Sequence, residues 1–437
     1  DESGPLVFAQ LSDIHYAPDA EALSRAFDDR EMAFPPQPTL DGIVAEIGSL
    51  APDFVILTGD IIANAKGPEL DEVKSWFVTM DAFASRFAVP TYETVGNHDV
   101  VRDPAVSKAV YEEHFGPTYY SFNVKGVHCV VLDLHVLDGT AIVYTIDPVQ
   151  LEWLRRDVAA ADASAPVLVF CHEPTPDWAD TAENAALWDF LAGSHITALV
   201  NGHWHTNFVV REEPFYELTS GAVCGAWWEG PNPDGTEFGY RVYEMARGRI
   251  ASTWRTVGKN VVSFASPVSA ELTWAGRLVA SVWGQAASAS YRWDGGQDTA
   301  VEVSTNGLWS TAAGYLNVTA LTAGYHTLSL SFVLSNGSTV RGDQGFLVQD
   351  PNLTLGEVMS HPEIFQGKLV GVSDLEVRAV MGTDISVTDG TKTVIVSKVP
   401  ITVARNDRVS VAGMYRPTSV DPIKGFDPVF FVKLVKQ

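Results

Sequence analysis

The sequence predicts an α/β domain followed by two small all-β domains. Short apolar runs alternate with helical patterns as far as about residue 259, where the helical period disappears. Short alternating segments separated by Gly, Asn and Asp turns then continue to the C-terminus. The composition changes at the same place. Of the net charge of −25, residues 1–259 carry −23 and residues 260–437 carry −2.

Residues 1–259 contain the apolar runs that are typical of buried strands in a layered α/β fold. We expect strands at Leu6–Leu11, Phe54–Leu57, Thr91–Val95, Val127–Leu132, Val167–Phe170 and Ile196–Val200. Between them the patterns predict helices at Asp41–Leu50, Glu69–Phe87, Pro104–Phe115 and Pro148–Ala161. Two closing strands joined at Arg247-Gly248 are expected within residues 239–257.

The two C-terminal segments are expected to be separate β domains, which gives three domains at 1–259, 260–350 and 351–437. The first segment resembles immunoglobulin-like or fibronectin-like β-sandwich modules, with residues 324–328 as a late strand entry. Several short strands in fewer than ~90 residues fit a small barrel such as an OB-fold in the second segment. Its expected strands are Lys368–Val372, Leu375–Met381, Asp384–Thr388, Thr393–Val396, Arg408–Tyr415 and Val429–Val435.

Composition excludes several classes of protein. A hydrophobic content of 46% rules out wholesale disorder, and a net charge of −25 disfavours broad binding to nucleic acid. No apolar run is long enough to predict a membrane-spanning helix. Cys129, Cys171 and Cys224 are too few and too widely spaced for a disulfide scaffold or a zinc ribbon, so we expect buried thiols.

Polar side chains follow five of the predicted strands, at the point where each strand ends. The carboxyl ends of strands form the edge of an α/β sheet where sites assemble. The five strands would therefore bring a set of carboxylate, amide and imidazole groups to one rim. The set is Asp13, His15, Asp60, Asn97, His98, Asp99, His172, His203 and His205.

These side chains are suited to two divalent metal ions. Imidazole and carboxylate together favour Zn, Mn and Fe, and the carboxylate of Asp60 can bridge two ions. The amide of Asn97 adds an oxygen ligand without adding negative charge. Two ions ~3.5–4 Å apart can activate a bridging water and hold a phosphoryl oxygen for in-line displacement. His98 could protonate the leaving oxygen, and Asp99 could orient or polarise His98.

The five motifs, in this order, resemble the calcineurin-like metallophosphoesterase superfamily over residues 5–257. They are Asp-x-His, Gly-Asp, Gly-Asn-His-Asp, His-x-Pro and Gly-His-x-His. The resemblance implies a four-layer α/β/β/α sandwich. It places one metal at Asp13, His15, Asp60 and His205 and a second at Asp60, Asn97, His172 and His203. It makes His98 the general acid or a phosphate contact. Ala63 stands where the purple acid branch has a tyrosine, which argues against an Fe(III)–tyrosinate centre.

The sequence therefore predicts a metal-dependent phosphoric ester hydrolase that carries two divalent or transition metal ions, with Mn, Fe or Zn favoured. The expected substrate is a small-molecule phosphate ester. A phosphomonoester dianion usually requires additional cationic groups, and the motif neighbourhoods offer few, Arg102 being the nearest in sequence. Phosphodiesters or broad specificity are therefore favoured. The alternatives are a phosphomonoesterase, or a nuclease directed to nucleic acid by the OB-like domain. A start at Asp1 and the appended β domains suggest export to a periplasm or the cell exterior.

Overall fold

The computed structural model describes residues 4–27, 31–273, 275–350, 352–382, 384–396, 403–416 and 429–436. The chain divides into two compact units. The first contains Asp1–Asn232 and Thr236–Gly258, and the second contains Pro233–Gly235 and Lys259–Gln437. Among the described residues, no helix has the length and apolar character needed to cross a membrane.

The first unit contains a five-stranded sheet in the order β13-β12-β1-β2-β3. Strands β1 to β3 are parallel, and β12 and β13 extend the sheet as an antiparallel pair. The strands are β1 (Leu6–Leu11), β2 (Phe54–Thr58), β3 (Thr91–Thr94), β12 (Gly239–Ala246) and β13 (Arg249–Thr256). The helices of this half of the unit are α1 (Ala20–Ala26), α2 (Pro36–Leu50), α3 (Leu70–Ala84) and α4 (Ala109–Phe115).

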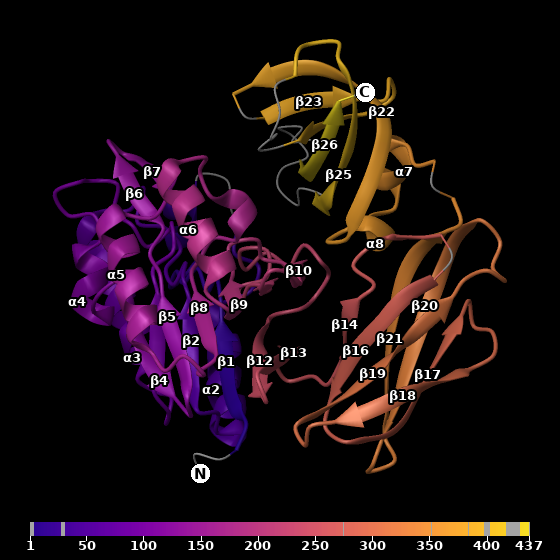
Figure 1. The fold of residues 1–437 in the computed structure, drawn as a ribbon, viewed down its shortest axis with the longest axis horizontal. Coiled ribbons are helices and arrows are strands. Elements are labelled where there is room, and N and C mark those ends of the chain that lie inside the picture. The colour runs from indigo at the N-terminus through magenta and orange to yellow at the C-terminus, as the bar shows by residue number, and fades with distance from the viewer. Residues whose placement is uncertain are drawn as a thin grey trace. The chain divides into compact units, whose positions relative to one another are not determined.

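A second, six-stranded sheet of the same unit has the order β10-β11-β9-β8-β5-β4. Its strands are β4 (Tyr120–Val124), β5 (Val127–Val131), β8 (Val167–Phe170), β9 (Ile196–Asn201), β10 (Phe208–Arg211) and β11 (Tyr216–Thr219). A separate hairpin is formed by β6 (His135–Asp138) and β7 (Ala141–Tyr144). Helices α5 (Pro148–Ala160) and α6 (Ala182–Gly193) and the 3₁₀ turn η1 (Thr175–Asp177) complete this half (Figure 1).

The two sheets share one apolar core. Phe8 of β1 stacks on Phe54 and Tyr243 with ring centroids 4.8 and 4.5 Å apart, and its ring meets Phe170 of β8 edge-on at 5.7 Å. The other face of the second sheet packs against α5 and α6 through residues that include Leu154 of α5. Side chains alternate along a strand, so a strand that is buried on both faces contributes side chains to two cores. This explains why its apolar run is unbroken.

The second unit contains an eight-stranded sheet in the order β14-β16-β19-β18-β17-β20-β21-β15. One core contains side chains from both halves of this sheet, among them Leu278 and Phe332, so the halves pack face to face. The strands are β14 (Val262–Ser266), β15 (Glu271–Leu272), β16 (Ala275–Trp283), β17 (Ala286–Trp293), β18 (Thr299–Thr305), β19 (Trp309–Asn317), β20 (Gly324–Leu334) and β21 (Thr339–Val348).

The remaining strands of the second unit form a closed barrel in the order β22-β23-β24-β26-β25. Helices α7 (Leu355–Ser360) and α8 (Pro362–Phe365) precede it in the chain. The strands are β22 (Leu369–Met381), β23 (Asp384–Thr388), β24 (Thr393–Val396), β25 (Arg408–Arg416) and β26 (Val429–Lys436). C-terminal all-β sheets are therefore present, as expected.

Some expected boundaries were wrong. Helix α2 begins at Pro36 rather than Asp41, because prolines in the first turn lose no intrahelical hydrogen bond. Strand β22 runs unbroken where two strands were expected, with its register shift between Val372 and Leu375. A β-bulge of this kind interrupts the alternation of side chains without ending the strand.

Candidate metal centre

The polar residues that follow the strands do meet at one place in the first unit. Asp13, Asp60 and Asn97 lie just beyond β1, β2 and β3, whose parallel pairing brings their carboxyl ends together. His172 and His203 follow β8 and β9, which are parallel neighbours in the second sheet. The two edges meet at one site, because Nε2 of His172 lies 3.0 Å from Oδ2 of Asp60.

The backbone is strained at this site. Five of the seven predicted metal ligands have positive φ angles between 45° and 66°. Asp and His adopt this left-handed region more readily than most residues, but a cluster of such residues marks a functional site. The five residues are Asp13, His15, Asp60, His203 and His205.

The motif glycines allow the turns to pack closely. A Cβ atom on Gly96 would lie 2.1 Å from the backbone nitrogen of Asp60. A Cβ atom on Gly202 would lie 2.5 Å from Oδ2 of Asp13. Both distances are below van der Waals contact, so only glycine permits these approaches.

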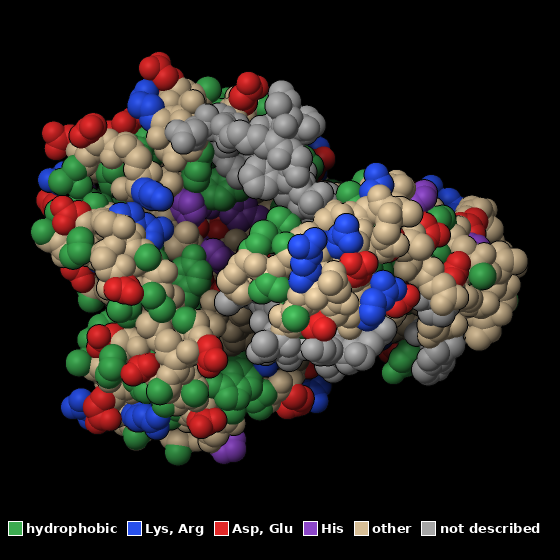
Figure 2. Space-filling view, turned by 90° about the horizontal axis from the view of Figure 1, so that it is seen from above, with side chains coloured by type: hydrophobic (Ala, Val, Ile, Leu, Met, Phe, Trp, Pro, Cys, Tyr) green, Lys and Arg blue, Asp and Glu red, His purple; other side chains and the backbone are tan. Residues whose placement is uncertain are grey.

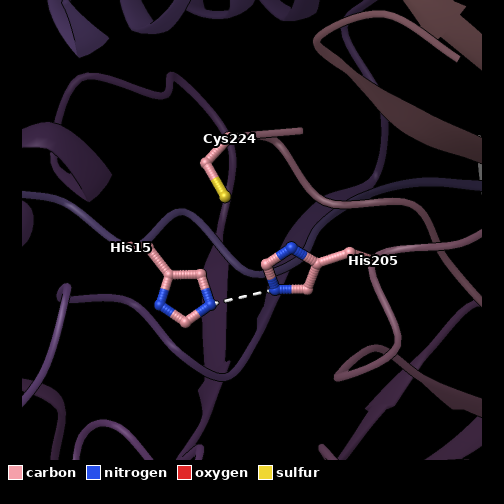
Figure 3. Close-up of side chains that lie close together, drawn as sticks. All are labelled: His15, His205 and Cys224. Atoms are coloured by element: carbon pink, nitrogen blue, oxygen red, sulfur yellow. Dashed lines mark hydrogen bonds between the residues drawn. The ribbon is translucent and has the colours of Figure 1, made fainter. Parts of the chain in front are cut away.

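The first cluster of donors contains Asp13, His15 and His205. Nε2 of His15 lies 3.1 Å from Nε2 of His205, and Oδ1 of Asp13 lies 3.3 Å from the latter atom. Figure 3 shows the two imidazoles facing each other beside the thiol of Cys224. One donor atom from each of these three side chains lies within 4.8 Å of the other two. The thiol donates to the carbonyl of Gly225 at 3.5 Å. All three cysteines are buried, as expected.

The second cluster contains Asp60, His172 and His203. Oδ2 of Asp60 lies 3.0 Å from Nε2 of His172, and Nδ1 of His203 lies 3.3 Å from the same nitrogen. The same Oδ2 lies 3.6 Å from Nε2 of His15 in the first cluster. Asp60 is therefore placed between the two clusters.

Hydrogen bonds to backbone carbonyls orient the imidazoles. Nδ1 of His172 lies 2.7 Å from the carbonyl oxygen of Thr58, and Nδ1 of His205 lies 2.8 Å from that of Gly225. Nδ1 of His15 lies 3.4 Å from the carbonyl oxygen of Ala63. A carbonyl only accepts, so each Nδ1 carries a proton, and each ring in its neutral form presents a lone pair at Nε2.

This arrangement fits a metal ion. Burial lowers the pKa of His15, which favours the neutral ring. The Nε2 lone pairs of His15 and His205 would repel each other at 3.1 Å unless a cation lies near both. Burial works against a charge on His172, but Asp60 and Asp13 still raise the pKa of that ring well above its usual range. The site therefore stabilises positive charge, and imidazole nitrogens with carboxylate oxygens suit Zn, Mn or Fe.

Two buried oxygens at the site have no hydrogen-bond partner, which also fits a metal ion. They are Oδ1 of Asp13 and Oδ1 of Asn97. A buried polar atom without a partner destabilises the folded protein by about 1–3 kcal/mol. Two such oxygens in one cluster therefore indicate that a ligand binds them.

His98 lies at the edge of the site and Asp99 lies beneath it. The backbone N–H of His98 donates to Oδ1 of Asp60 at 2.7 Å. Burial lowers the pKa of the His98 ring to about 3, against the opposing charge of Asp60. The two carboxylate oxygens of Asp99 accept from the backbone N–H groups of Ile61, Ile62 and Gly96. These contacts fix the turn, while a catalytic role for Asp99 stays a prediction.

Side chains outside the five motifs also lie next to the site. Trp227 packs over the imidazoles, with its ring centroid 3.9 Å from that of His15. Tyr144 of β7 meets His203 edge-on at 5.6 Å. His135 lies in a buried network, with Nε2 2.6 Å from Oε1 of Glu173. No motif marks these residues, because the chain's path in space brings them to the site.

Comparison with known proteins agrees with this geometry. Residues 6–207 match the family model described as calcineurin-like phosphoesterase. This segment is a calcineurin-like phosphoesterase domain. The family implies a dinuclear metal site, which the two donor clusters can accommodate. The predicted enzyme class, a hydrolase of phosphoric esters, agrees with the names of the relatives that the domain resembles.

Two curated relatives resemble the phosphoesterase domain. A Rhodococcus erythropolis protein named "Probable cyclic nucleotide phosphodiesterase" is 27% identical over 202 residues, which are 45% of this chain and 63% of the relative. "Purple acid phosphatase 22" of Arabidopsis thaliana is 26% identical over 187 residues, 37% of this chain and 40% of the relative. The chain thus spans less than two thirds of each. A dimetal phosphatase structure from Danio rerio aligns with 58% of this chain and all of its own, at 17% identity and a TM-score of 0.40.

Proposed function

We propose that the protein hydrolyses phosphate esters with two bound divalent or transition metal ions. One ion would be held by Asp13, His15, Asp60 and His205, and the other by Asp60, Asn97, His172 and His203. One observation carries the proposal: Nε2 of His15 and Nε2 of His205 lie 3.1 Å apart while the Nδ1 atom of each ring lies near a carbonyl. When bound, two such ions supply Lewis acidity and an activated water.

The chain's own residues position the reacting groups. Asp60 points Oδ2 between the two donor clusters, because its Oδ1 is held by the N–H of His98. His98 is thereby fixed at the edge of the site. There its neutral ring can donate a hydrogen bond to a phosphoryl oxygen or to the leaving oxygen.

Phosphodiesters suit this site better than phosphomonoesters. Arg102 is half-buried, and burial lowers the pKa of its guanidinium against the opposing charge of Asp60. Its Nη2 donates to the carbonyl oxygen of Asn97 at 3.4 Å, which places the guanidinium at the edge of the site. A diester carries one negative charge, whereas a monoester carries nearly two at neutral pH. A single guanidinium at the site matches the single charge of a diester.

The test compares substrates and metals in one protein. The stripped protein is reconstituted with Mn, Zn, Fe or Mg and assayed with bis(4-nitrophenyl) phosphate and 4-nitrophenyl phosphate. We expect two metal equivalents and a higher kcat/KM for the diester. Asp60→Asn should lose metal and activity, whereas the exposed Asp71→Asn should not. Full hydrolysis by metal-free protein, or by Asp60→Asn, contradicts the proposal.

We propose finer domain assignments on the same basis. A core shared by two β-sheets, with helices packed on the second of them, supports a four-layer α/β/β/α sandwich. The eight-stranded sheet with one enclosed core supports an immunoglobulin-like or fibronectin-like module. If the barrel strands are numbered one to five along the chain, their order around the barrel is one, two, three, five and four. This order supports an OB-fold.

The barrel favours one second candidate, a phosphodiesterase directed to nucleic acid. OB-folds bind single strands through a basic groove and stacked aromatic rings. The net charge of −25 opposes this candidate. Single-stranded DNA that binds at low salt and dissociates steeply as salt rises supports it. Absence of binding at low salt rejects it and leaves the small-molecule phosphoesterase in place.

A further inference from the structure

A buried carboxylate lies behind one histidine of the second donor cluster. Nε2 of His203 lies 3.4 Å from Oδ2 of Asp177, and the indole N–H of Trp204 donates to the same oxygen at 2.7 Å. Asp177 ends the 3₁₀ turn η1, which follows His172 in the chain, whereas Trp204 follows His203 directly. The segment that supplies the ligand His172 therefore also supplies the carboxylate partner of His203.

The burial of Asp177 is unusual for a carboxylate on this acidic protein. Figure 2 shows acidic side chains spread over the surface, and the net charge of the chain is −25. Asp177 and Trp204, by contrast, are only 5% and 4% exposed. A buried carboxylate destabilises the fold unless hydrogen bonds or a positive charge compensate for the lost water. Trp204 supplies a hydrogen bond, and an ion bound by His203 would supply positive charge through the ring.

The ring of His203 is oriented differently from the other imidazoles of the two clusters. Those of His15, His172 and His205 have Nδ1 near a backbone carbonyl oxygen. In His203 it is Nε2 that lies near an acceptor, the carboxylate of Asp177, while Nδ1 lies 3.3 Å from Nε2 of His172. An ionised carboxylate only accepts, so this contact favours a proton on Nε2 and leaves the lone pair on Nδ1. Nδ1 is the ring nitrogen that faces the second cluster.

We propose that Asp177 is a positioning residue for the second metal ion and that it acts through His203. It holds the ring proton on Nε2, so that Nδ1 is the ligand atom, and its negative charge makes the ring a stronger donor. Trp204 fixes the carboxylate in place through the indole N–H. The inference rests on the proposed function with two metal ions. It goes further, because it makes the affinity for one ion, and not for the other, depend on a residue outside the five motifs.

The test measures the affinity for each ion by titrating metal-stripped protein with zinc in a chelator buffer. His203→Gln removes a ligand of the second ion and so identifies the titration step that belongs to it. Asp177→Ala should weaken that step about 10–100-fold and leave the other step within about twofold of the wild type. Asp177→Asn should lose less, because its amide oxygen can still accept the indole N–H. Asp157→Ala is the matched control and should change neither step, because Asp157 lies 2.8 Å from Nε2 of His128, which is outside the donor clusters.

Two further measurements distinguish positioning from a general loss of stability. In zinc-loaded wild type with ¹⁵N-labelled histidine, NMR should show the proton of His203 on Nε2 and zinc on Nδ1, with the signals assigned through His203→Gln. Trp204→Phe keeps an aromatic ring but removes the indole N–H, so it should weaken the same titration step by a smaller factor than Asp177→Ala. A proton on Nδ1 of His203, an unchanged second step in Asp177→Ala, or equal losses at both steps overturns the inference.

Failure of the inference can be distinguished from failure of the proposed function. Wild-type protein that binds two ions but hydrolyses neither bis(4-nitrophenyl) phosphate nor 4-nitrophenyl phosphate contradicts the proposed function, and the titrations still decide the role of Asp177. Ester hydrolysis by protein with two ions, together with a second step that does not respond to Asp177→Ala, overturns the inference alone.

Discussion

The backbone N–H of His98 donates to Oδ1 of Asp60 at 2.7 Å. This bond leaves Oδ2 of Asp60 as the oxygen that faces both donor clusters, 3.6 Å from Nε2 of His15 and 3.0 Å from Nε2 of His172. The side chain that would bridge two metals is thus oriented by the residue that would contact the substrate. Metal binding and substrate contact depend on the same turn.

Lengthening the side chain of Asp60 should uncouple the two clusters. In Asp60→Glu the carboxylate cannot keep both the bond to the N–H of His98 and the position of Oδ2. We expect fewer than two metal equivalents by elemental analysis and a fall in diesterase activity of roughly 100-fold or more. Asp71→Asn, with exposed Asp71 in α3, serves as the control. Two metals and wild-type activity in Asp60→Glu would show that Asp60 does not bridge.

Asp99 should prove to be a positioning residue. Its carboxylate accepts three backbone N–H groups, from Ile61, Ile62 and Gly96, in a fully buried position. Asp99→Ala leaves these donors unsatisfied, so we expect a loss of about 3 kcal/mol in the free energy of unfolding in urea. The conservative Asp99→Asn should recover part of it. If Asp99→Ala loses activity at unchanged stability and metal content, Asp99 instead acts on His98 during the reaction.

The buried ion pair formed by His135 and Glu173 should contribute more to the free energy of unfolding than a surface ion pair does. Glu173 is fully buried, and Oε1 lies 2.6 Å from Nε2 of His135, whose Nδ1 lies 3.1 Å from Oδ1 of Asp133. Glu173→Gln removes one partner of a buried ion pair, which typically costs about 3–5 kcal/mol.

The comparison uses an exposed ion pair on α5. Glu152 lies 3.3 Å from Arg156 one turn along that helix, and both side chains are largely exposed. Glu152→Gln should change stability by less than about 0.5 kcal/mol. Equal effects of Glu173→Gln and Glu152→Gln in urea unfolding would mean that the His135 network contributes no more than a surface pair.

Glu93 should make stability depend on pH. Burial, with a smaller contribution from Asp81, raises the pKa of Glu93 to about 7. Because this pKa is higher in the folded protein, the stability that protonated Glu93 contributes is complete below the unfolded-state pKa of about 4.5. It is lost as the pH rises through 7. Glu93→Gln should therefore gain stability over the wild type between pH 5 and 8, by about 3 kcal/mol at the upper end. Urea unfolding across this range checks the sign, with exposed Glu113→Gln as the control. A difference that does not vary with pH contradicts the assignment.

Strand and motif positions could be predicted from the sequence because they depend on local order. The run of Leu6–Leu11 is a strand with the expected bounds, and so is Val167–Phe170. Both are buried on two faces, so their apolar pattern is unbroken. Helix α6 and the β6–β7 hairpin were missed, because their patterns are weaker and their stability comes from packing. Boundaries set by proline turns and by the bulge in β22 were missed for the same reason.

The sequence by itself determined which residues could reach one edge of the fold, because a strand's carboxyl end lies where its apolar run stops. It therefore predicted Asp13, Asp60 and His205 as neighbours. Only the tertiary structure decided which atom of each side chain faces the site, since that depends on partners such as the N–H of His98 and the carbonyl of Gly225. It also decided that Trp227 lies over the imidazoles, because loop packing rather than any local pattern holds that ring there.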